Sequence, residues 1–135
     1  MLSLLLFIPN TSNLARRTQK VYSDVLGRPW KAEVIDWNGA VYATTTTKYD
    51  ALDRPVRVRQ YAGATTAQSP EQEPAGEAAG YQTATMAYDR HGRLQSRHTP
   101  EQEATAFTTY TYNPDDTPLT VTDGRNAVTT YSYAG

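Results

Sequence analysis

The sequence predicts an all-β fold, a repetitive antiparallel meander of β-hairpins. Three observations predict it: a composition rich in Thr and Tyr, residue types that alternate with period two, and a turn motif that recurs along the chain. Ten of the 135 residues are tyrosines, and the hydrophobic fraction is 39%. β-branched and aromatic residues are typical of half-buried strands. Tyrosine suits such strands because it buries a large ring while its hydroxyl reaches a polar partner.

The chain begins with an apolar segment, Met1–Ile8, that does not contain the recurring motif. This segment is much shorter than the ~20 apolar residues of a transmembrane helix. It also lacks the positive charges that begin a signal peptide. We therefore expect residues 1–20 to be a non-repeat apolar leader and the protein not to be transmembrane. A short helix is expected at most over Ser12–Lys20.

The recurring motif is a turn that occurs four times after the leader. Each copy opens with Asp or Asn and carries Gly or Asp three residues later, the residue choice of a type I turn followed by a position tolerant of positive φ. A Tyr directly precedes three copies, whereas Tyr22 stands one residue further from the first, as though Ser23 were inserted. The residues assigned to this motif are Tyr22, Asp24, Gly27, Arg28, Tyr49, Asp50, Asp53, Arg54, Tyr88, Asp89, Gly92, Arg93, Leu94, Tyr112, Asn113, Asp116 and Tyr133.

The segments on both sides of each turn alternate as strands do. Thr108–Tyr112 runs into one turn and Leu119–Val121 runs out of it. A second kind of turn, at Asp36–Gly39 and Asp123–Asn126, comes where the outgoing strand ends. Each repeat is therefore predicted to be strand, turn, strand, turn. Residues 21–135 are expected to form an array of about four such repeats.

A low-complexity insertion interrupts the array at residues 64–80. It is rich in Ala, Glu, Gln, Pro and Gly and has few apolar residues to offset the entropy of ordering. We expect a solvated loop at a second-turn position and the first site of proteolytic cleavage. Ser69–Glu73 is echoed by Thr99–Glu103, which indicates equivalent positions for the two segments.

The residues predict no enzyme and no catalytic, cofactor or metal site. A net charge of −1 with mixed signs argues against nucleic acid as a partner, and there are no cysteines. His91 and His98 have no fixed carboxylate partner, and neither a nucleophile elbow nor a phosphate-binding loop occurs. Arg28, Arg54 and Arg93 recur after the turns. We expect them to pair with an acid or a backbone carbonyl of the neighbouring repeat.

The segment Tyr88-Asp-Arg-His-Gly-Arg-Leu94 resembles the YD repeat of the Rhs (rearrangement hotspot) family, and Asp123–Tyr133 resembles that family's link between repeats. The resemblance covers the chain from Val21 onward. It implies a strip of long hairpins that spirals into a hollow β-shell around a toxic C-terminal domain. It further implies a secreted or cell-surface parent protein that acts in bacterial competition, with the neighbouring repeats and the enclosed toxin as partners.

The sequence also departs from the family pattern. It contains no Asp-Pro-x-Gly segment of the kind that ends the Rhs core, and no toxin domain follows. We therefore expect a truncated fragment without activity that self-associates through its open sheet edges. The alternative function is a carbohydrate- or protein-binding surface module that uses a tyrosine-lined sheet face.

Overall fold

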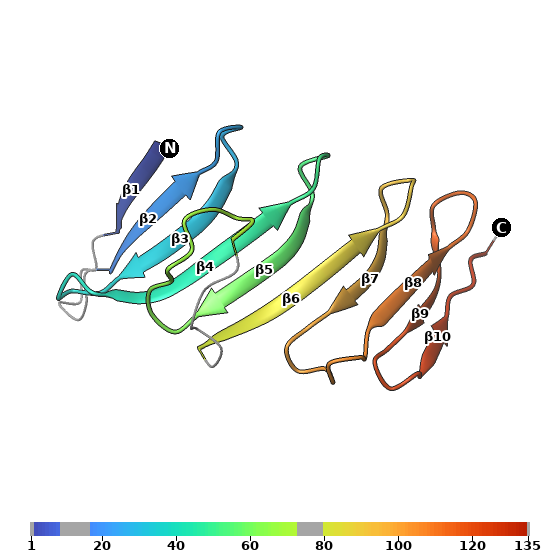
Figure 1. Ribbon diagram of the computed structural model, residues 1–135. Coiled ribbons are helices and arrows are strands. Elements are labelled where there is room, and N and C mark those ends of the chain that lie inside the picture. Colours follow the sequence, from blue (N-terminus) through green and yellow to red (C-terminus); the bar gives the residue numbers. More distant parts are fainter. Residues whose placement is uncertain (1, 9–16, 73–79, 135) are drawn as a thin grey trace. The chain divides into compact units, whose positions relative to one another are not determined.

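The computed structural model describes residues 2–8, 17–72 and 80–134, and all regular structure among them is β-strand (Figure 1). No helix in these ranges could cross a bilayer. The predicted all-β hairpin meander is confirmed, because successive strands pair antiparallel. The strands are β1 (Leu2–Ile8), β2 (Arg17–Ser23), β3 (Pro29–Ile35), β4 (Val41–Tyr49), β5 (Pro55–Tyr61), β6 (Tyr81–Tyr88), β7 (Leu94–His98), β8 (Thr108–Tyr112), β9 (Pro118–Thr122) and β10 (Val128–Thr130).

The chain forms two compact units, Met1–Thr83 and Ala84–Gly135. The first contains β1 to β5, and the second contains β7 to β10, while β6 crosses the division. Strand β1 pairs with β2 along its whole length, from Leu2 opposite Ser23 to Ile8 opposite Arg17. The apolar segment thus adds a strand to the sheet, and β2 runs across the expected leader boundary at residue 20. The helix expected over Ser12–Lys20 is also wrong where the structure describes it, from Arg17 onward.

The four motif turns contain a left-handed residue where the sequence predicts one. Gly27 and Gly92 have φ of 80° and 85°, and Asp53 and Asp116 have φ of 63° and 68°. Gly39 and Asn126 close the second-turn segments with φ of 84° and 63°. Positive φ in this position twists the two strands of a hairpin in the sense that the sheet requires.

Gly27 offers a clean test of this backbone requirement. A Cβ at Gly27 would meet no atom within 4 Å, so a substitution there changes only backbone strain. We expect Gly27→Val to lower the free energy of unfolding by about 1–2 kcal/mol, because a β-branched residue disfavours the left-handed region. Gly27→Asn should lower the free energy of unfolding by only a few tenths of the loss expected for Gly27→Val, since asparagine adopts this conformation readily. Urea denaturation of both variants measures the difference, and equal losses would contradict the argument.

Each motif hairpin also skips one residue of its outgoing strand. The register shifts at the same place in all four hairpins. The first residue of the outgoing strand has a partner directly opposite, and the second has none. The skipped residues are Trp30, Val56, Gln95 and Leu119. A β-bulge of this kind bends the strand and increases its twist. No residue type is shared by the four skipped positions, which is why the sequence does not reveal the bulge.

The register also corrects the alignment of the first repeat. Tyr49 lies opposite Pro55 and Tyr112 lies opposite Pro118, and in the first hairpin the residue opposite Pro29 is Ser23. Ser23 is therefore not inserted, but stands where the other repeats have their tyrosine. Because successive side chains of a strand point to opposite faces, Tyr22 lies on the other face from the motif tyrosines.

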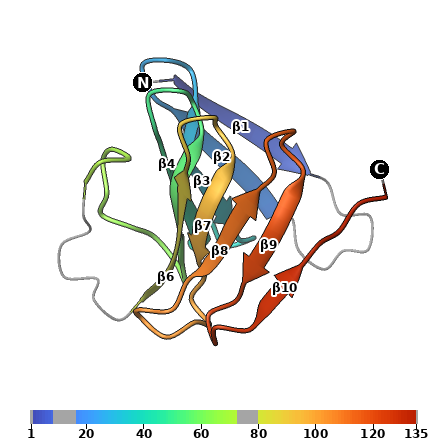
Figure 2. The same ribbon diagram turned by 90° about the vertical axis from the view of Figure 1, so that its right-hand side faces the viewer.

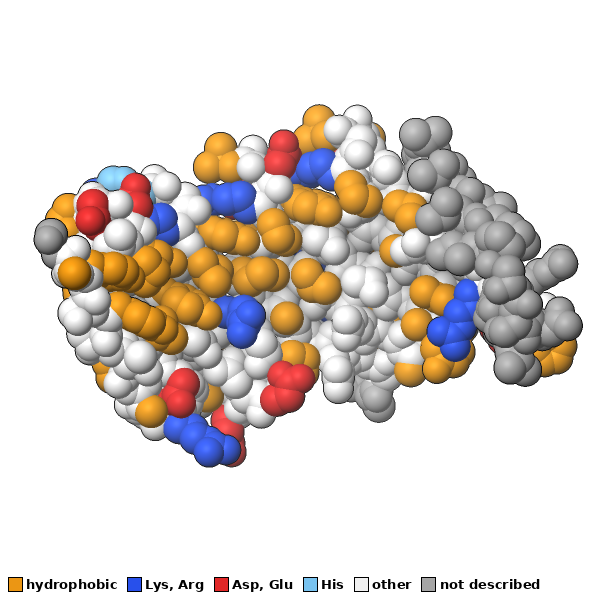
Figure 3. Space-filling view, turned by 180° about the vertical axis from the view of Figure 1, so that it is seen from behind, with side chains coloured by type: hydrophobic (Ala, Val, Ile, Leu, Met, Phe, Trp, Pro, Cys, Tyr) orange, Lys and Arg blue, Asp and Glu red, His pale blue; other side chains and the backbone are white. Residues whose placement is uncertain are grey.

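The two sheet faces of the first unit differ in charge. Residues directly opposite in antiparallel strands share a face, so Thr44 and Tyr61 lie on one side and Thr45 and Gln60 on the other. All charged residues of the paired positions from Gln19 to Val34 and from Ala43 to Tyr61 fall on the Thr44 side. The view from behind shows mainly hydrophobic and uncharged side chains over the strands (Figure 3). The Thr44 side is also the more buried one, with Thr44 1% and Tyr61 5% exposed.

Residues 62–72 form a segment, called the strap below, that crosses over β4 on the Thr44 side (Figure 1). From the side, the strap stands on one side of the strands (Figure 2). Thr44 Oγ1 donates a hydrogen bond to Gly63 O at 2.6 Å, and Ala67 is 2% exposed. The expectation of a solvated loop over 64–80 misses the burial of Ala67, although residues 64–72 are irregular and otherwise exposed or half-buried. Residues 73–79 lie outside the described part.

Candidate functional site

The recurring chemistry of this protein lies in its motif turns. In the first, Asp24 Oδ1 accepts hydrogen bonds from the backbone N–H groups of Leu26 and Arg28 at 2.9 and 3.0 Å. Asp50 and Asp89 accept the same pair of bonds in their own turns. A carboxylate that takes two backbone donors holds the turn closed and explains why Asp opens it.

The arginine at the end of each turn binds that carboxylate as well. Arg28 Nε lies 2.8 Å from Asp24 Oδ2, Arg54 Nε lies 2.7 Å from Asp50 Oδ2, and Arg93 Nε lies 2.8 Å from Asp89 Oδ2. Each turn thus uses both carboxylate oxygens, one for the backbone and one for the guanidinium. Charge-assisted hydrogen bonds of this length are the stronger kind.

Two of these arginines also reach the next motif turn of their own unit. Arg28 Nη1 donates to Asp53 Oδ1 at 2.8 Å and to Asp50 O at 3.1 Å. Arg93 Nη1 donates to Asp116 Oδ1 at 2.7 Å. The prediction that the arginines pair with an acid or a carbonyl of the neighbouring repeat is therefore confirmed for Arg28 and Arg93. We call this arrangement the Asp–Arg turn ladder.

The motif tyrosines join the ladder from the following repeat. Tyr49 donates its hydroxyl to Pro29 O at 2.8 Å, Tyr112 to Leu94 O at 2.7 Å, and Tyr133 to Pro118 O at 2.8 Å. The accepting residue is in each case the one directly after the turn of the preceding hairpin. The guanidinium carbons of Arg28 and Arg93 lie 5.1 and 4.7 Å from the ring centroids of Tyr49 and Tyr112, within cation–π range.

The fourth motif turn departs from this pattern. Asn113 replaces the opening Asp, and its Nδ2 donates to Thr117 Oγ1 at 2.9 Å. Asp115 Oδ1 accepts from Thr117 N at 3.2 Å and from Thr117 Oγ1 at 2.6 Å. Thr117 cannot extend to the next turn as an arginine does. The adjacent Asp115 and Asp116 therefore serve two different contacts and do not face each other as an acid–base pair.

The second-turn segments share the backbone geometry of the motif turns but not the arginine. Asp36 and Asp123 each accept two backbone N–H bonds with Oδ1, and Ala40 and Ala127 stand at the position of the arginine. Alternate turns of the meander lie at opposite ends of the strands. The ladder therefore runs along one end of each unit only.

The carboxylates that open three of the motif turns, Asp24, Asp50 and Asp89, have pKa values below their ordinary range. At Asp24 and Asp89, partial removal from water raises the pKa, but hydrogen bonds from Arg28 and Arg93 outweigh it and lower the pKa. At Asp50 the hydrogen bond from the Arg54 side chain is the main cause of the lowered pKa. A carboxyl whose pKa is lower in the folded state stabilises the fold above its unfolded value and loses that contribution as the pH falls.

This sign predicts acid sensitivity of the fold. The contribution of the ladder is complete above the unfolded Asp pKa of about 3.9 and disappears as the pH falls through the lower folded values. We expect the urea midpoint to be steady near pH 7 and to fall below about pH 4. Asp24→Asn should lower the midpoint at pH 7 and flatten its dependence between pH 4 and pH 2. A variant that keeps the wild-type slope would contradict the assignment to Asp24.

The tyrosine contact can be tested apart from the charges. Tyr112→Phe removes the hydroxyl that donates to Leu94 O and keeps the ring beside Arg93. We expect the free energy of unfolding to fall by about 1 kcal/mol, the usual value of one hydrogen bond. Tyr131→Phe is the matched control, because its ring is 43% exposed, and it should change little. The two variants are compared by thermal and urea unfolding.

The other residues considered for chemistry lie apart from one another. His91 is exposed in a turn, and its backbone N–H donates to Asp89 Oδ1. His98 Nε2 lies 3.2 Å from Glu103 O, and its ring lies 5.3 Å from that of Phe107. Among the described residues, no three His, Cys, Asp or Glu side chains gather as metal ligands would.

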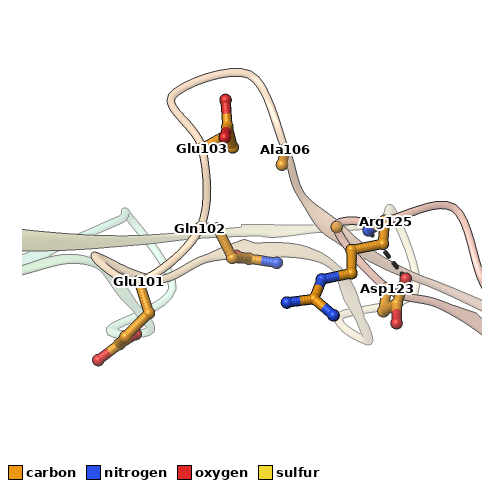
Figure 4. Close-up of a pocket in the computed structure, with 7 residues that line it drawn as sticks. Glu101, Gln102, Glu103, Ala106, Asp123 and Arg125 are labelled. Carbon is orange, nitrogen blue, oxygen red and sulfur yellow. Dashed lines mark hydrogen bonds between the residues drawn. The ribbon is translucent and has the colours of Figure 1, made fainter.

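A pocket of about 470 Å³ in the second unit is lined mainly by residues of two segments already noted in the sequence, Thr99–Glu103 and Asp123–Asn126 (Figure 4). The side chains of Gln102 and Arg125 point toward each other, while Glu101 and Glu103 point away (Figure 4). Gln102 Nε2 donates to Thr108 Oγ1 at 3.0 Å, and its Oε1 accepts from Thr99 N at 2.8 Å. The Gln102 amide thus stabilises the connection between β7 and β8. The polar side chains that line the pocket do not converge on one point, as those of a ligand site would.

The Pro-Glu-Gln segments of the two longer connections form similar turns. Gln72 N donates to Ser69 O and Gln102 N donates to Thr99 O, at 3.2 and 3.0 Å. One follows β5 and the other follows β7, both at second-turn positions. The predicted equivalence of these two segments is therefore confirmed for their described residues. The signal in the sequence was the shared Pro-Glu-Gln order. It places the side-chain amide of Gln72 or Gln102 where it accepts a backbone hydrogen bond of its own turn.

Comparison with known proteins leaves the family undecided. No family model matches the sequence, and no curated protein matches it significantly. The repeat assignment therefore depends on the regularity of the chain itself. That regularity is physical, since the same contacts recur at Arg28 and Arg93 and at Tyr49, Tyr112 and Tyr133.

Proposed function

We propose that this chain is a structural segment of a β-shell of the Rhs type, in which hairpin repeats enclose a toxic C-terminal domain of a secreted parent protein. The observation that carries the proposal is the connection from each motif turn to the next. Arg28 closes its own turn and binds the following one, and Arg93 repeats the arrangement. Such contacts serve the extension of a sheet by further hairpins, and they perform no reaction.

The repeat contacts support a wall in preference to a binding module. A glycan-binding face requires tyrosine rings and hydroxyls that are available to sugar. The hydroxyls of Tyr49, Tyr112 and Tyr133 instead donate to backbone carbonyls of the preceding hairpin. Two of these rings also lie against arginines. The motif tyrosines thus connect hairpins, which is the role that a wall needs.

Repeat proteins bury the faces of each unit against neighbouring units. In this chain the hydrophobic core is small, since the buried hydrophobic residues described are Trp30, Tyr61 and Ala67. Many large apolar side chains remain exposed, including Val25, Leu26 and Leu52. A parent protein with further repeats would bury more of this surface. The expected self-association of the isolated chain follows from the same exposure.

The test is the DNA sequence on both sides of the coding region. We expect further Tyr-Asp repeats in frame, followed by an Asp-Pro-x-Gly segment and a variable domain. Purified parent protein should then protect that domain from protease, and the isolated chain should not change its tryptophan fluorescence with sugars. Flanking DNA without repeats would contradict the shell proposal. A saturable fluorescence change with a sugar would favour the surface-binding alternative instead.

A further inference from the structure

The face of the first unit beneath the strap is strongly basic. Lys20 lies opposite Glu33, Lys31 opposite Thr46, Lys48 opposite Arg57, and Thr46 opposite Arg59. Directly opposite residues share a face, so five cations and one carboxylate gather on it. The reverse face carries no charge over the paired positions from Gln19 to Val34 and from Ala43 to Tyr61.

Part of this charge is already compensated within the face. Lys31 Nζ lies 3.2 Å from Glu33 Oε1, and both side chains are largely buried. Lys20 Nζ and Lys31 Nζ lie 4.7 and 4.5 Å from the ring centroid of Tyr22. Arg59 lies over the ring of Tyr81 at 5.2 Å. These contacts fix the cations of β2, β3 and β5 in place before any partner arrives.

The strap supplies the contacts that an acidic peptide would supply. Lys48 Nζ lies 2.5 Å from Glu71 Oε2, and Arg57 Nη2 donates to Pro70 O at 3.0 Å. Ala67 fills a small buried site at 2% exposure. The strap thus presents a carboxylate, a backbone carbonyl and a small apolar side chain to the basic face.

The described strap residues bury little apolar surface on this face. Within residues 64–72, Ala67 is the one buried side chain, so closure removes little apolar surface from water. The ion pair of Lys48 and Glu71 is partly exposed, at 34% and 64% of the two side chains, which limits its strength. A segment with few buried contacts opens at a small cost in free energy.

We propose that this strap-covered face is a docking surface for an extended acidic peptide segment of a partner protein, and that the strap is its intramolecular competitor. The inference stands apart from the structural role proposed above. The occupant is identified by charge complementarity and by the strap's own contacts. A partner segment with two or more carboxylates would bind Lys48 and Arg57 once the strap opens.

The experiment measures binding of a fluorescein-labelled peptide of sequence Ser-Pro-Glu-Gln-Glu-Pro-Ala-Gly-Glu by anisotropy. Ala67→Gln adds bulk without charge at the buried site and should open the strap. We expect this variant to bind the peptide about tenfold more tightly than the wild type, because the competitor in cis is weakened. Ala64→Gln, at an exposed position of the same strap, should bind as the wild type does.

Two further variants keep the test decisive if Ala67→Gln disturbs folding, which circular dichroism would reveal. Glu71→Gln removes the strap's carboxylate at an exposed position and should also tighten peptide binding. Adding Lys48→Gln to either variant should abolish the gain. A peptide with glutamine at its three glutamate positions should not bind.

Three results would overturn the proposal. Equal affinity of the wild type and both opened variants would show that the strap does not compete. Equal binding of the uncharged peptide would remove the role of charge. Binding of inorganic polyphosphate as tight as that of the peptide, with the same dependence on Lys48, would assign the face to polyanions in general.

Discussion

Trp30→Ala is expected to lower the free energy of unfolding of the first unit by about 3–5 kcal/mol, the usual cost of deleting a buried tryptophan side chain. Trp30 is 2% exposed and is the bulged residue of the first motif hairpin. Its loss removes the largest buried side chain among the described residues of the unit and leaves a void where the strand bends. The urea midpoint, followed by far-UV circular dichroism, should fall by roughly 2 M.

Trp37→Ala is the matched control for this prediction. Trp37 is 72% exposed in the Asp36–Gly39 turn, and an exposed substitution of this kind changes stability by about 0.5 kcal/mol or less. Comparable losses in the two variants would show that Trp30 is not part of a packed core. A loss at Trp30 alone, with the second unit unaffected, would support independent stability of the two units.

Thr44→Val is expected to cost about 1–3 kcal/mol, because it leaves a carbonyl without its donor in a site closed to water. Thr44 is 1% exposed, and its hydroxyl donates to Gly63 O at 2.6 Å where the strap leaves β5. Valine has nearly the same shape and favours strands equally well. The expected loss therefore reports the hydrogen bond and not the packing or the backbone.

Thr45→Val provides the control one residue away. Thr45 is half-buried on the opposite face of the same strand, and valine there should leave stability unchanged or raise it slightly. Unfolding in urea gives the global effect, and limited proteolysis within residues 62–72 gives the local one. Thr44→Val should accelerate cleavage of the strap, and Thr45→Val should not. Identical behaviour of the two variants would contradict the role given to the Gly63 contact.

Much of the turn chemistry could be predicted from the sequence. Asp at the start and Gly or Asp three residues later are typical of a type I turn that ends in a left-handed residue. The positive φ at Gly27, Asp53, Gly92 and Asp116 therefore follows from residue type. The arginine that ends the turn is four residues from its aspartate, but from the sequence we expected it to pair with the neighbouring repeat and missed the pair within the turn. The turn conformation is local, and local sequence is sufficient to predict it.

The role of the tyrosines could not be predicted from their spacing in the sequence alone. The sequence shows Tyr directly before three of the four motif turns, but the hydroxyls of Tyr49 and Tyr133 bind carbonyls 20 and 15 residues away. Which carbonyl lies within reach depends on the register of the whole hairpin. The same register placed Ser23, not Tyr22, at the tyrosine position of the first repeat.

The apolar start of the chain and the insertion both make contacts with the sheet that the sequence did not predict. Met1–Ile8 lacks the motif, yet the backbone of β1 supplies the partners that the edge of β2 needs. Edge strands accept pairing through their backbone groups and do not require a motif. The strap has the composition of a solvated loop, yet Ala67 is buried and Glu71 pairs with Lys48 of β4.

The sequence by itself determined the strand-and-turn order and the conformation of the motif turns, because these depend on residues within a few positions of each other. Only the tertiary structure decided which turns are linked, which carbonyls the tyrosines bind, which face of the first unit is basic, and what the strap covers. Those features depend on register, and a shift of one residue moves every side chain of a strand to the other face.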